Sequence, residues 1–133
     1  MKTAPRSPST VIVILIVCLF AGLTAYAQKR RGNQQKSVSK AAGLVEEAGK
    51  LADDKKYPEA IEAYKLAIRL DANYAPAYGG LGDAYFNSGN SEQALTAYKE
   101  QARLAPNDAD AQYDLGYFYN AMGRHGEAFA PLI

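Results

Sequence analysis

The sequence repeats with a regular period of about 34 residues, and such a period restricts the folds that the chain can adopt. A shift by one period aligns small residues with small ones and aromatic residues with aromatic ones, without a gap. The matched sets include Ala60, Ala94 and Ala128, then Tyr64 and Tyr98, then Gly82 and Gly116. Periods of about 20 to 50 residues are typical of arrays in which each repeat is one supersecondary unit stacked against the next. The sequence therefore predicts a stacked repeat protein.

Each repeat is predicted to contain two helices. Small and apolar residues recur three and four positions apart, which is the spacing that brings side chains onto one face of a helix. One such series is Tyr78, Leu81, Gly82 and Tyr85, and another is Ala94, Leu95, Tyr98 and Ala102. Because the helical spacing is found in both halves of the period, the fold class is predicted to be all-α.

Turn residues separate the predicted helices at regular places. Gly89 and Gly123 fall just after the first helices of their repeats, where a residue without a Cβ ends a helix at low cost. The pair Lys55–Lys56 occupies the equivalent turn of the first repeat. Pro58 and Pro76 are placed to open helices, because proline fits the first helical turn. The ends and starts of the predicted helices therefore follow the period.

Two of the predicted helices have candidate caps at their amino ends. Asn90 is followed three residues later by Gln93, which is the spacing of a capping box. Asp108 precedes the helix predicted to begin at Ala109, where its carboxylate can accept a hydrogen bond from a backbone N–H. We expect both residues to fix the start of a helix.

The repeated residues resemble the signature of the tetratricopeptide repeat family. Its large aromatic, Leu-Gly pair, second aromatic, alanine, third aromatic and proline have counterparts here in Tyr78, Leu81, Gly82, Tyr85, Ala94, Tyr98 and Pro106. The resemblance implies antiparallel helix pairs stacked into a right-handed solenoid of about two and three-quarter repeats over residues 41–133. The implied units are 41–74, 75–108 and an incomplete 109–133.

The carboxyl end of the sequence stops within the third unit. Pro131 would interrupt the last helix soon after its start. The residues expected to leave an apolar face uncovered there are Leu115, Phe118, Phe129, Leu132 and Ile133. Three interpretations are open: a fragment of a longer repeat protein, a partner that covers this face, or self-association through the uncapped face as a structural repeat segment.

Residues 1–27 have the features of a signal peptide. Lys2 and Arg6 precede the apolar run Val11–Leu23, and Ala25-Tyr26-Ala27 offers small residues for cleavage after Ala27. Cleavage would make the protein secreted, or periplasmic and part of the cell envelope. The alternative is a retained signal anchor, because residues 11–27 are at the lower limit of what spans a hydrocarbon core of about 30 Å. In that case residues 11–27 attach the chain to a membrane.

Residues 28–40 are predicted to be a flexible basic linker. The segment contains no acidic residue and only one large apolar side chain, Val38. Its basic residues are Lys29, Arg30, Arg31, Lys36 and Lys40. A segment of this kind cannot bury enough apolar surface to fold by itself. A patch for anionic lipid or for a cell-envelope polymer is the functional alternative, since clustered basic residues near a bilayer attract anionic groups.

The resemblance also implies where a partner would bind. In this family the first helix of each pair faces a concave groove. Tyrosines there give rigid contact area, asparagines hydrogen-bond a peptide backbone, and aspartates favour basic or amine-bearing ligands. The implied partner-binding residues, called here the predicted groove, are Asp83, Phe86, Asn87, Asp110, Tyr113, Asp114, Tyr117 and Asn120. We expect a protein or peptide partner.

Composition argues against several other functions. The 15 Lys and Arg nearly balance the 14 Asp and Glu, for a formal net charge of +1, so the chain has no global field that attracts nucleic acid. Cys18 is the only cysteine and His125 the only histidine, which leaves neither a thiolate cluster nor a nucleophile–base pair. We expect no catalytic residue, metal, cofactor or nucleic-acid partner. The leading hypothesis is a protein-interaction scaffold without enzyme activity.

Overall fold

The structure is a computed structural model that describes residues 7–123. Over this range the chain forms five helices and no strand, which confirms the predicted all-α class. They are α1 (Pro8–Asp53), α2 (Tyr57–Leu70), α3 (Ala75–Asn87), α4 (Ser91–Leu104) and α5 (Ala109–Ala121). The starts of α2 and α4 are one sequence period apart, as are those of α3 and α5. The chain divides into two compact units, residues 1–36 and 37–133.

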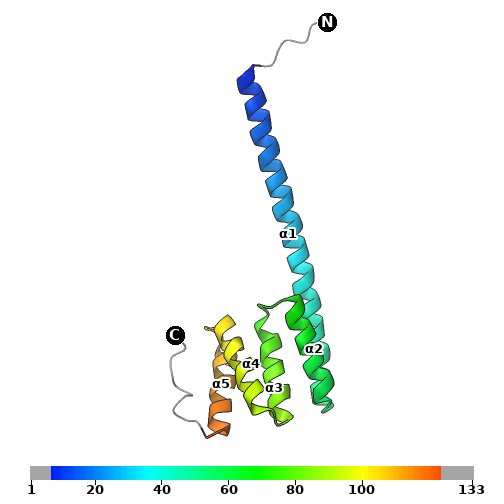
Figure 1. The fold of residues 1–133 in the computed structure, drawn as a ribbon, viewed down its shortest axis with the longest axis vertical. Coiled ribbons are helices and arrows are strands. Elements are labelled where there is room, and N and C mark those ends of the chain that lie inside the picture. Colours follow the sequence, from blue (N-terminus) through cyan, green and yellow to red (C-terminus); the bar gives the residue numbers. More distant parts are fainter. Residues whose placement is uncertain (1–6, 124–133) are drawn as a thin grey trace. The chain divides into compact units, whose positions relative to one another are not determined.

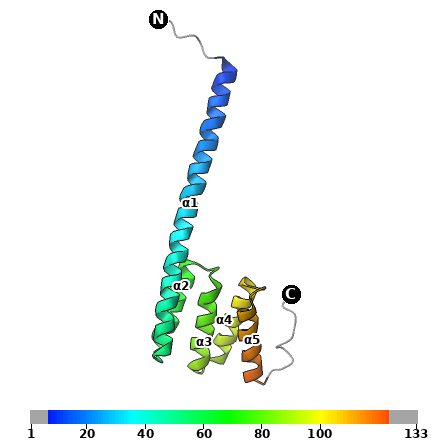
Figure 2. The same ribbon diagram turned by 180° about the vertical axis from the view of Figure 1, so that it is seen from behind.

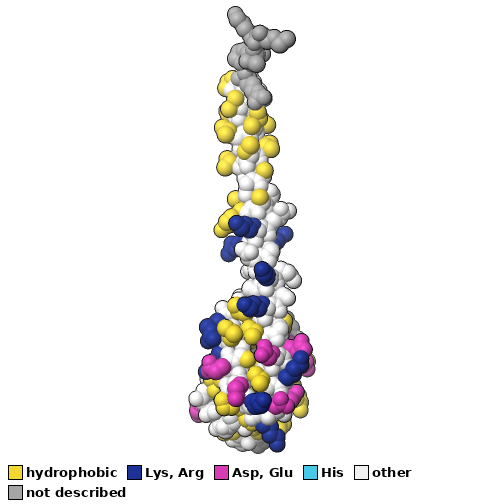
Figure 3. All heavy atoms as spheres, turned by 90° about the vertical axis from the view of Figure 1, so that its right-hand side faces the viewer, with side chains coloured by type: hydrophobic (Ala, Val, Ile, Leu, Met, Phe, Trp, Pro, Cys, Tyr) yellow, Lys and Arg dark blue, Asp and Glu magenta, His cyan; other side chains and the backbone are white. Residues whose placement is uncertain are grey.

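In the first unit, the described residues belong almost entirely to the amino-terminal part of α1. The large apolar side chains between Val11 and Tyr26 are all exposed. Figure 3 shows hydrophobic side chains around this part of the helix, followed by Lys and Arg side chains. An 18-residue window of α1 has a mean hydropathy of 2.5 and none of it is buried, so this helix is long and apolar enough to cross a membrane. A signal sequence has the same properties.

The prediction of a flexible linker over residues 28–40 is wrong. These residues are helical and lie within α1, which runs without a break from Pro8 to Asp53. Most residues of the segment are Lys, Arg or Gln, which are strong helix formers and offset the cost of about 1 kcal/mol that Gly32 carries relative to alanine. Helix formed on both sides also removes the cost of nucleation, since elongation adds one hydrogen bond per residue. The helix expected to begin at Ala41 is thus the end of a much longer one.

In the second unit, neighbouring helices run antiparallel. Figures 1 and 2 show α2 beside the carboxyl-terminal part of α1, α4 beside α3, and α5 beside α4. One core cluster surrounds Tyr64 on α2 and includes Ala48 and Leu81. A second surrounds Tyr98 on α4 and includes Ala94 and Phe118. Small residues let the helices approach while the tyrosines fill the space between them, as the sequence predicts.

Three turns end helices with a left-handed residue. The φ angles are 85° at Gly89, 70° at Gly123 and 60° at Lys55. In the turn after α3, the N–H of Asn90 donates to the carbonyl of Tyr85, and after α1 the N–H of Lys56 donates to that of Leu51. These hydrogen bonds satisfy carbonyl groups that the end of a helix leaves without partners. The first repeat therefore makes the same turn with lysine in place of glycine.

The amino ends of the helices agree only in part with the sequence analysis. Proline occupies the first turn of both α2 and α3, as predicted for Pro58 and Pro76. The Asp108 carboxylate accepts a hydrogen bond of 3.0 Å from the N–H of Asp110, which confirms that cap. The capping box at Asn90 does not form. Its side chain instead donates to the hydroxyl of Ser88 at 2.9 Å.

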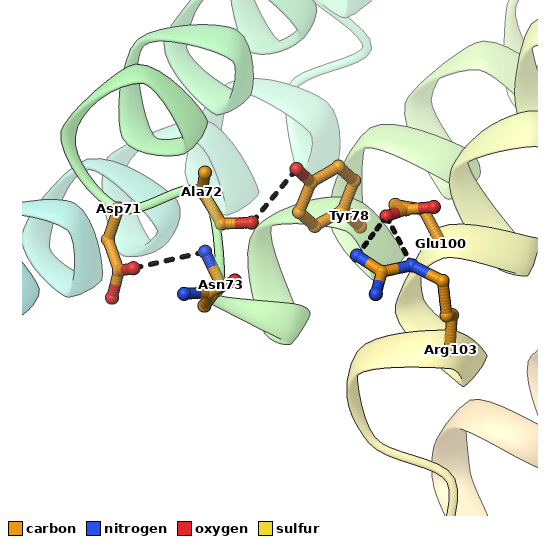
Figure 4. Close-up of polar contacts among 6 residues, drawn as sticks. All are labelled: Asp71, Ala72, Asn73, Tyr78, Glu100 and Arg103. Carbon is orange, nitrogen blue, oxygen red and sulfur yellow. Dashed lines mark hydrogen bonds and ion pairs between the residues drawn. The ribbon is translucent and has the colours of Figure 1, made fainter.

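Side chains also fix the connection between α2 and α3 (Figure 4). The N–H of Asn73 donates to the carboxylate of Asp71 at 3.1 Å, and the hydroxyl of Tyr78 donates to the carbonyl of Ala72 at 3.0 Å. On α4, Arg103 donates to Glu100 at 2.7 Å. The leading aromatic residue of the second repeat therefore binds back to the turn before it. This holds the first helix of that repeat against the preceding one.

The third repeat is described only through α5 and the turn after it. Leu115 and Phe118 are 6% and 2% exposed and pack against α4, so the prediction that they belong to an uncovered terminal face is wrong. They face inward because they share a side of α5 with Ala111 and Tyr119, which are also buried. The rest of the predicted face, Phe129, Leu132 and Ile133, lies outside the described residues.

Candidate functional site

The predicted groove draws its residues from α3 and α5, the first helices of the second and third repeats. Asp83, Asn87, Asp110, Tyr113, Tyr117 and Asn120 are exposed, whereas Phe86 and Asp114 are half-buried. The structure brings part of this set together through side chains of α4. The other members lie on the same two helices with separate local contacts.

Two tyrosines form the most exposed part of the predicted groove. Tyr113 and Tyr117 are 70% and 55% exposed. They are one helical turn apart on α5, and their rings stack with centroids 6.2 Å apart and planes at 20°. Stacking limits the rotamers that the two rings can adopt, so they form a preformed aromatic surface.

The side chains of Phe86 and Asn87 make contacts within the protein that the sequence does not predict. The ring of Phe86 packs edge-on against Phe118, with centroids 5.7 Å apart, so part of it belongs to the core. The amide of Asn87 donates to the backbone carbonyl of Asp83 at 2.9 Å. The Phe86 ring therefore stabilises the contact of α3 with α5, whereas the hydrogen bond of Asn87 lies within α3.

Asp83 is held by a residue of α4. The hydroxyl of Tyr98 donates to Oδ1 of Asp83 at 2.6 Å. Although the residue as a whole is exposed, its carboxyl group lies partly shielded beside Tyr98, and this desolvation raises the pKa of Asp83. The hydrogen bond from Tyr98 lowers the pKa and the charge of Asp114 raises it. Burial and the same hydrogen bond also raise the pKa of Tyr98 well above its usual range. The tyrosine is therefore a hydrogen-bond donor at any physiological pH.

Asp114 is held by a second residue of α4. Nε2 of Gln101 donates to Oδ2 of Asp114 at 3.2 Å. Gln101 is only 7% exposed, and its carbonyl oxygen Oε1 is buried without a hydrogen-bond partner among the described residues. A Cβ on Gly79 would lie 2.7 Å from Nε2, so the absence of a side chain on α3 makes room for this amide. A buried polar atom without a partner is costly and uncommon in folded proteins.

From the sequence, Tyr98 is expected only to pack between helices, and Gln101 is not among the predicted site residues. Comparison of equivalent positions in the repeats would have indicated Gln101. Ala67 stands one period earlier, where the repeat has a small apolar residue, and it is fully buried. A glutamine at a buried alanine position demands a polar partner, and Asp114 supplies only one of the hydrogen bonds.

A separate hollow lies between α3 and α4, with a volume of about 370 Å³. Its lining residues are Tyr78, Leu81, Tyr85, Gln93, Thr96, Ala97 and Glu100. None of them belongs to the predicted groove. Within residues 7–123, no group of three or more His, Cys, Asp or Glu side chains is arranged to hold a metal ion. Cys18, on α1, is exposed.

Comparison with known proteins identifies the repeats. A family model for the TPR repeat matches residues 50–89 and 82–123, which together cover more than half of the chain. The chain belongs to the tetratricopeptide repeat family. Its helix pairs and the positions of its small residues are those of this family, whose fold is a protein-interaction scaffold and is typically not enzymatic.

The similar proteins include one sequence relative and two solved structures. The small glutamine-rich tetratricopeptide repeat-containing protein 2 of Mycosarcoma maydis is 31% identical over 91 residues, which are 68% of this chain and 26% of that protein. The crystal structure of MamA matches with a TM-score of 0.61 and 28% identity, over 66% of this chain and 52% of that one. YrrB, described as a TPR protein with an unusual peptide-binding site, matches with a TM-score of 0.60 and 22% identity, over 71% and 51%. The chain thus spans about a quarter of that relative and half of the two solved chains.

Proposed function

We propose that this protein is an exported or membrane-tethered scaffold that binds a segment of a partner protein through the predicted groove. The observation that carries the proposal is the stacked, exposed pair Tyr113 and Tyr117 on α5, the helix that also carries Asp114, whose charge acts on Asp83 of the preceding repeat. Two neighbouring repeats supply these groups, so a bound segment would contact both. YrrB shares the fold and is described as having a peptide-binding site, which supports this class of function.

The chemistry of the predicted groove suits a peptide better than a small metabolite. The tyrosine rings offer rigid amphipathic area and lose little side-chain entropy on binding. The aspartates favour a segment with a positive charge and increase its rate of association. The groove is an open surface on two helices, whereas most small-molecule sites are enclosed. We also propose that the chain has no enzyme activity and acts only by binding.

The amino-terminal helix supports a location at a membrane or beyond it. Its apolar segment is fully exposed, and exposed apolar runs of this length in water are costly unless a bilayer or a signal-recognition pathway receives them. Retention would keep residues 11–27 as an anchor, and cleavage after Ala27 would release the repeats. In both cases the repeats are carried to a membrane by α1.

A display selection tests binding. The full chain in detergent micelles is used to select peptides from a random twelve-residue library, and their affinities are measured by fluorescence anisotropy. We expect Tyr113→Ala and Tyr117→Ala each to weaken the selected peptides about tenfold. The control is Leu66→Ala, because Leu66 is also exposed and apolar but lies on α2. Equal affinity for both tyrosine variants and the wild type would rule out the predicted groove as the binding surface.

A mass measurement tests location. The full chain is produced in a bacterial host, fractionated into soluble and membrane pools, and weighed by intact mass spectrometry. A product that begins at Gln28 shows a cleaved signal peptide, and a full-length product that resists alkaline extraction shows an anchor. A full-length product in the soluble pool would contradict both forms of the proposal.

A further inference from the structure

Two carboxylates from neighbouring repeats meet the same side of α4. Asp83 on α3 accepts from the hydroxyl of Tyr98, and Asp114 on α5 accepts from the amide of Gln101. Tyr98 and Gln101 are three residues apart on one helix, so they lie next to each other on its surface. Each hydrogen bond uses one oxygen of a carboxylate, which has two oxygens and about four acceptor sites. We call these four residues the carboxylate cluster.

The first junction of the repeats shows that packing does not require these polar groups. The positions one period before Asp83, Gln101 and Asp114 hold Gly49, Ala67 and Gly80. Both glycines lie beside Tyr64, the counterpart of Tyr98. The same helix arrangement therefore forms around a tyrosine with small neighbours in one place and with two carboxylates and an amide in the other.

The cluster is incomplete as a set of polar groups. Gln101 is 7% exposed, and its Oε1 has no donor among the described residues. The ion pairs of the described chain join Lys50 with Glu46, Lys65 with Glu62, and Arg103 with Glu100, so neither aspartate of the cluster belongs to one. The charge of Asp114 also raises the pKa of Asp83, which shows that the two carboxylates repel each other. A cation with several N–H donors would neutralise the two carboxylates, while Gln101 holds Asp114 in place from below.

We propose that the carboxylate cluster recognises an arginine side chain of the bound partner segment; this rests on the proposed function and names the chemistry of the same site. A guanidinium group has five donors in one plane, which suits carboxylates presented by two neighbouring helices. Lysine provides three donors at a single point and cannot address separate acceptors in the same way. The tyrosine pair on α5 adds an aromatic surface on which a guanidinium group can stack.

The test uses matched peptides against the full chain in detergent micelles. A selected peptide that contains arginine is compared with versions in which citrulline or lysine replaces that residue, since citrulline has almost the same shape without the charge. The protein variants are Asp83→Asn, Asp114→Asn and Gln101→Ala, with Glu47→Gln as the control because Glu47 is an exposed acid on α1. Circular dichroism confirms that each variant keeps its helices. Gln101→Ala introduces the alanine that the first repeat has at the equivalent position, Ala67, so this variant is compatible with the fold.

We expect the citrulline peptide to bind the wild type at least tenfold more weakly than the arginine peptide, and the lysine peptide to lie between them. In Asp83→Asn and Asp114→Asn this difference should shrink to about threefold or less, because the charge that distinguishes the peptides has lost its partner. Gln101→Ala should weaken the arginine peptide a few-fold and leave the citrulline peptide unchanged. Glu47→Gln should behave as the wild type. If a substituted residue only supported the fold, its substitution would weaken the binding of the arginine and citrulline peptides equally.

The outcomes separate this inference from the proposed function. Selected peptides that bind through Tyr113 and Tyr117 but show no penalty for citrulline would overturn the arginine site and leave the scaffold function standing. Equal binding of the arginine and lysine peptides would overturn the preference for a planar donor. A selection that yields no peptide contacting the predicted groove would overturn both.

Discussion

Tyr64 and Tyr98 occupy the same position of successive repeats, yet their hydroxyl groups have different surroundings. Tyr64 lies among small residues, with a site for a Cβ on Gly80 only 2.3 Å from its ring. Tyr98 packs against Phe118 and other residues of α5, and its hydroxyl donates a hydrogen bond to Asp83. The comparison shows that the repeat specifies where a tyrosine packs, whereas the residues around it decide whether the junction only packs or also presents charge.

The test with the largest expected effect on stability adds a methyl group beside Tyr64. Gly80→Ala should lower the free energy of unfolding by about 1–3 kcal/mol, because the new Cβ overlaps the ring and forces it to move. Urea unfolding of the full chain in micelles, followed by circular dichroism, measures the change. The control is Gly43→Ala on α1, where a Cβ meets nothing within 4 Å and better helix propensity should give a gain of up to about 1 kcal/mol. Similar gains for both variants would show that the packing around Tyr64 does not require a glycine at position 80.

The second test removes the two hydroxyl groups. Tyr98→Phe should cost about 1 kcal/mol, because it removes the hydrogen bond to a charged carboxylate whose surroundings are partly apolar. Tyr64→Phe should be nearly neutral, because the hydroxyl of Tyr64 makes no hydrogen bond within residues 7–123. The same unfolding measurement applies to both variants. Equal costs would contradict the difference between the junctions.

The third test makes the turns of the first two repeats alike. Lys55 adopts φ 60°, a left-handed conformation that Gly89 adopts without strain in the second repeat. Lys55→Gly should therefore raise the free energy of unfolding by about 0.5–1 kcal/mol, after the greater freedom of glycine in the unfolded chain is taken into account. Gly89→Lys is the reciprocal variant and should lose a similar amount. A loss of stability in Lys55→Gly would show that the lysine side chain contributes a contact worth more than the strain.

The smallest expected effect concerns the pH dependence of Asp83. Its pKa is raised in the folded protein, so the stability that it contributes is fully present below its unfolded pKa and declines as pH rises through its folded value. Asp83→Asn removes this decline. The variant should gain a few tenths of a kcal/mol on the wild type as pH increases from about 3 to 6, a small effect because solvent screens an exposed carboxylate. Unfolding curves across this pH range measure it, and a gain that appears on lowering the pH would reverse the assignment.

The candidate site could be predicted only in part. The repeat indicates which helices carry it, and the exposed tyrosines and aspartates are among the expected residues. Phe86 is expected at the surface although its ring packs on Phe118, because helical spacing does not show how far a neighbouring helix reaches over a face. Gln101 is not among the expected residues, because a search for exposed polar residues on first helices passes over a buried amide on a second helix.

The sequence by itself determined the repeat length, the all-α class, the positions of the turns and most helix starts, because these depend on local spacing and on glycine and proline preferences. It did not determine that residues 28–40 continue α1, since helix propagates into a polar segment from structure on both sides. It also did not show that Asp83 and Asp114 share one side of α4, or that Gln101 has a carbonyl oxygen without a donor among the described residues. Those facts depend on contacts between residues 13 to 15 positions apart, and only the packing of α3, α4 and α5 brings such residues together.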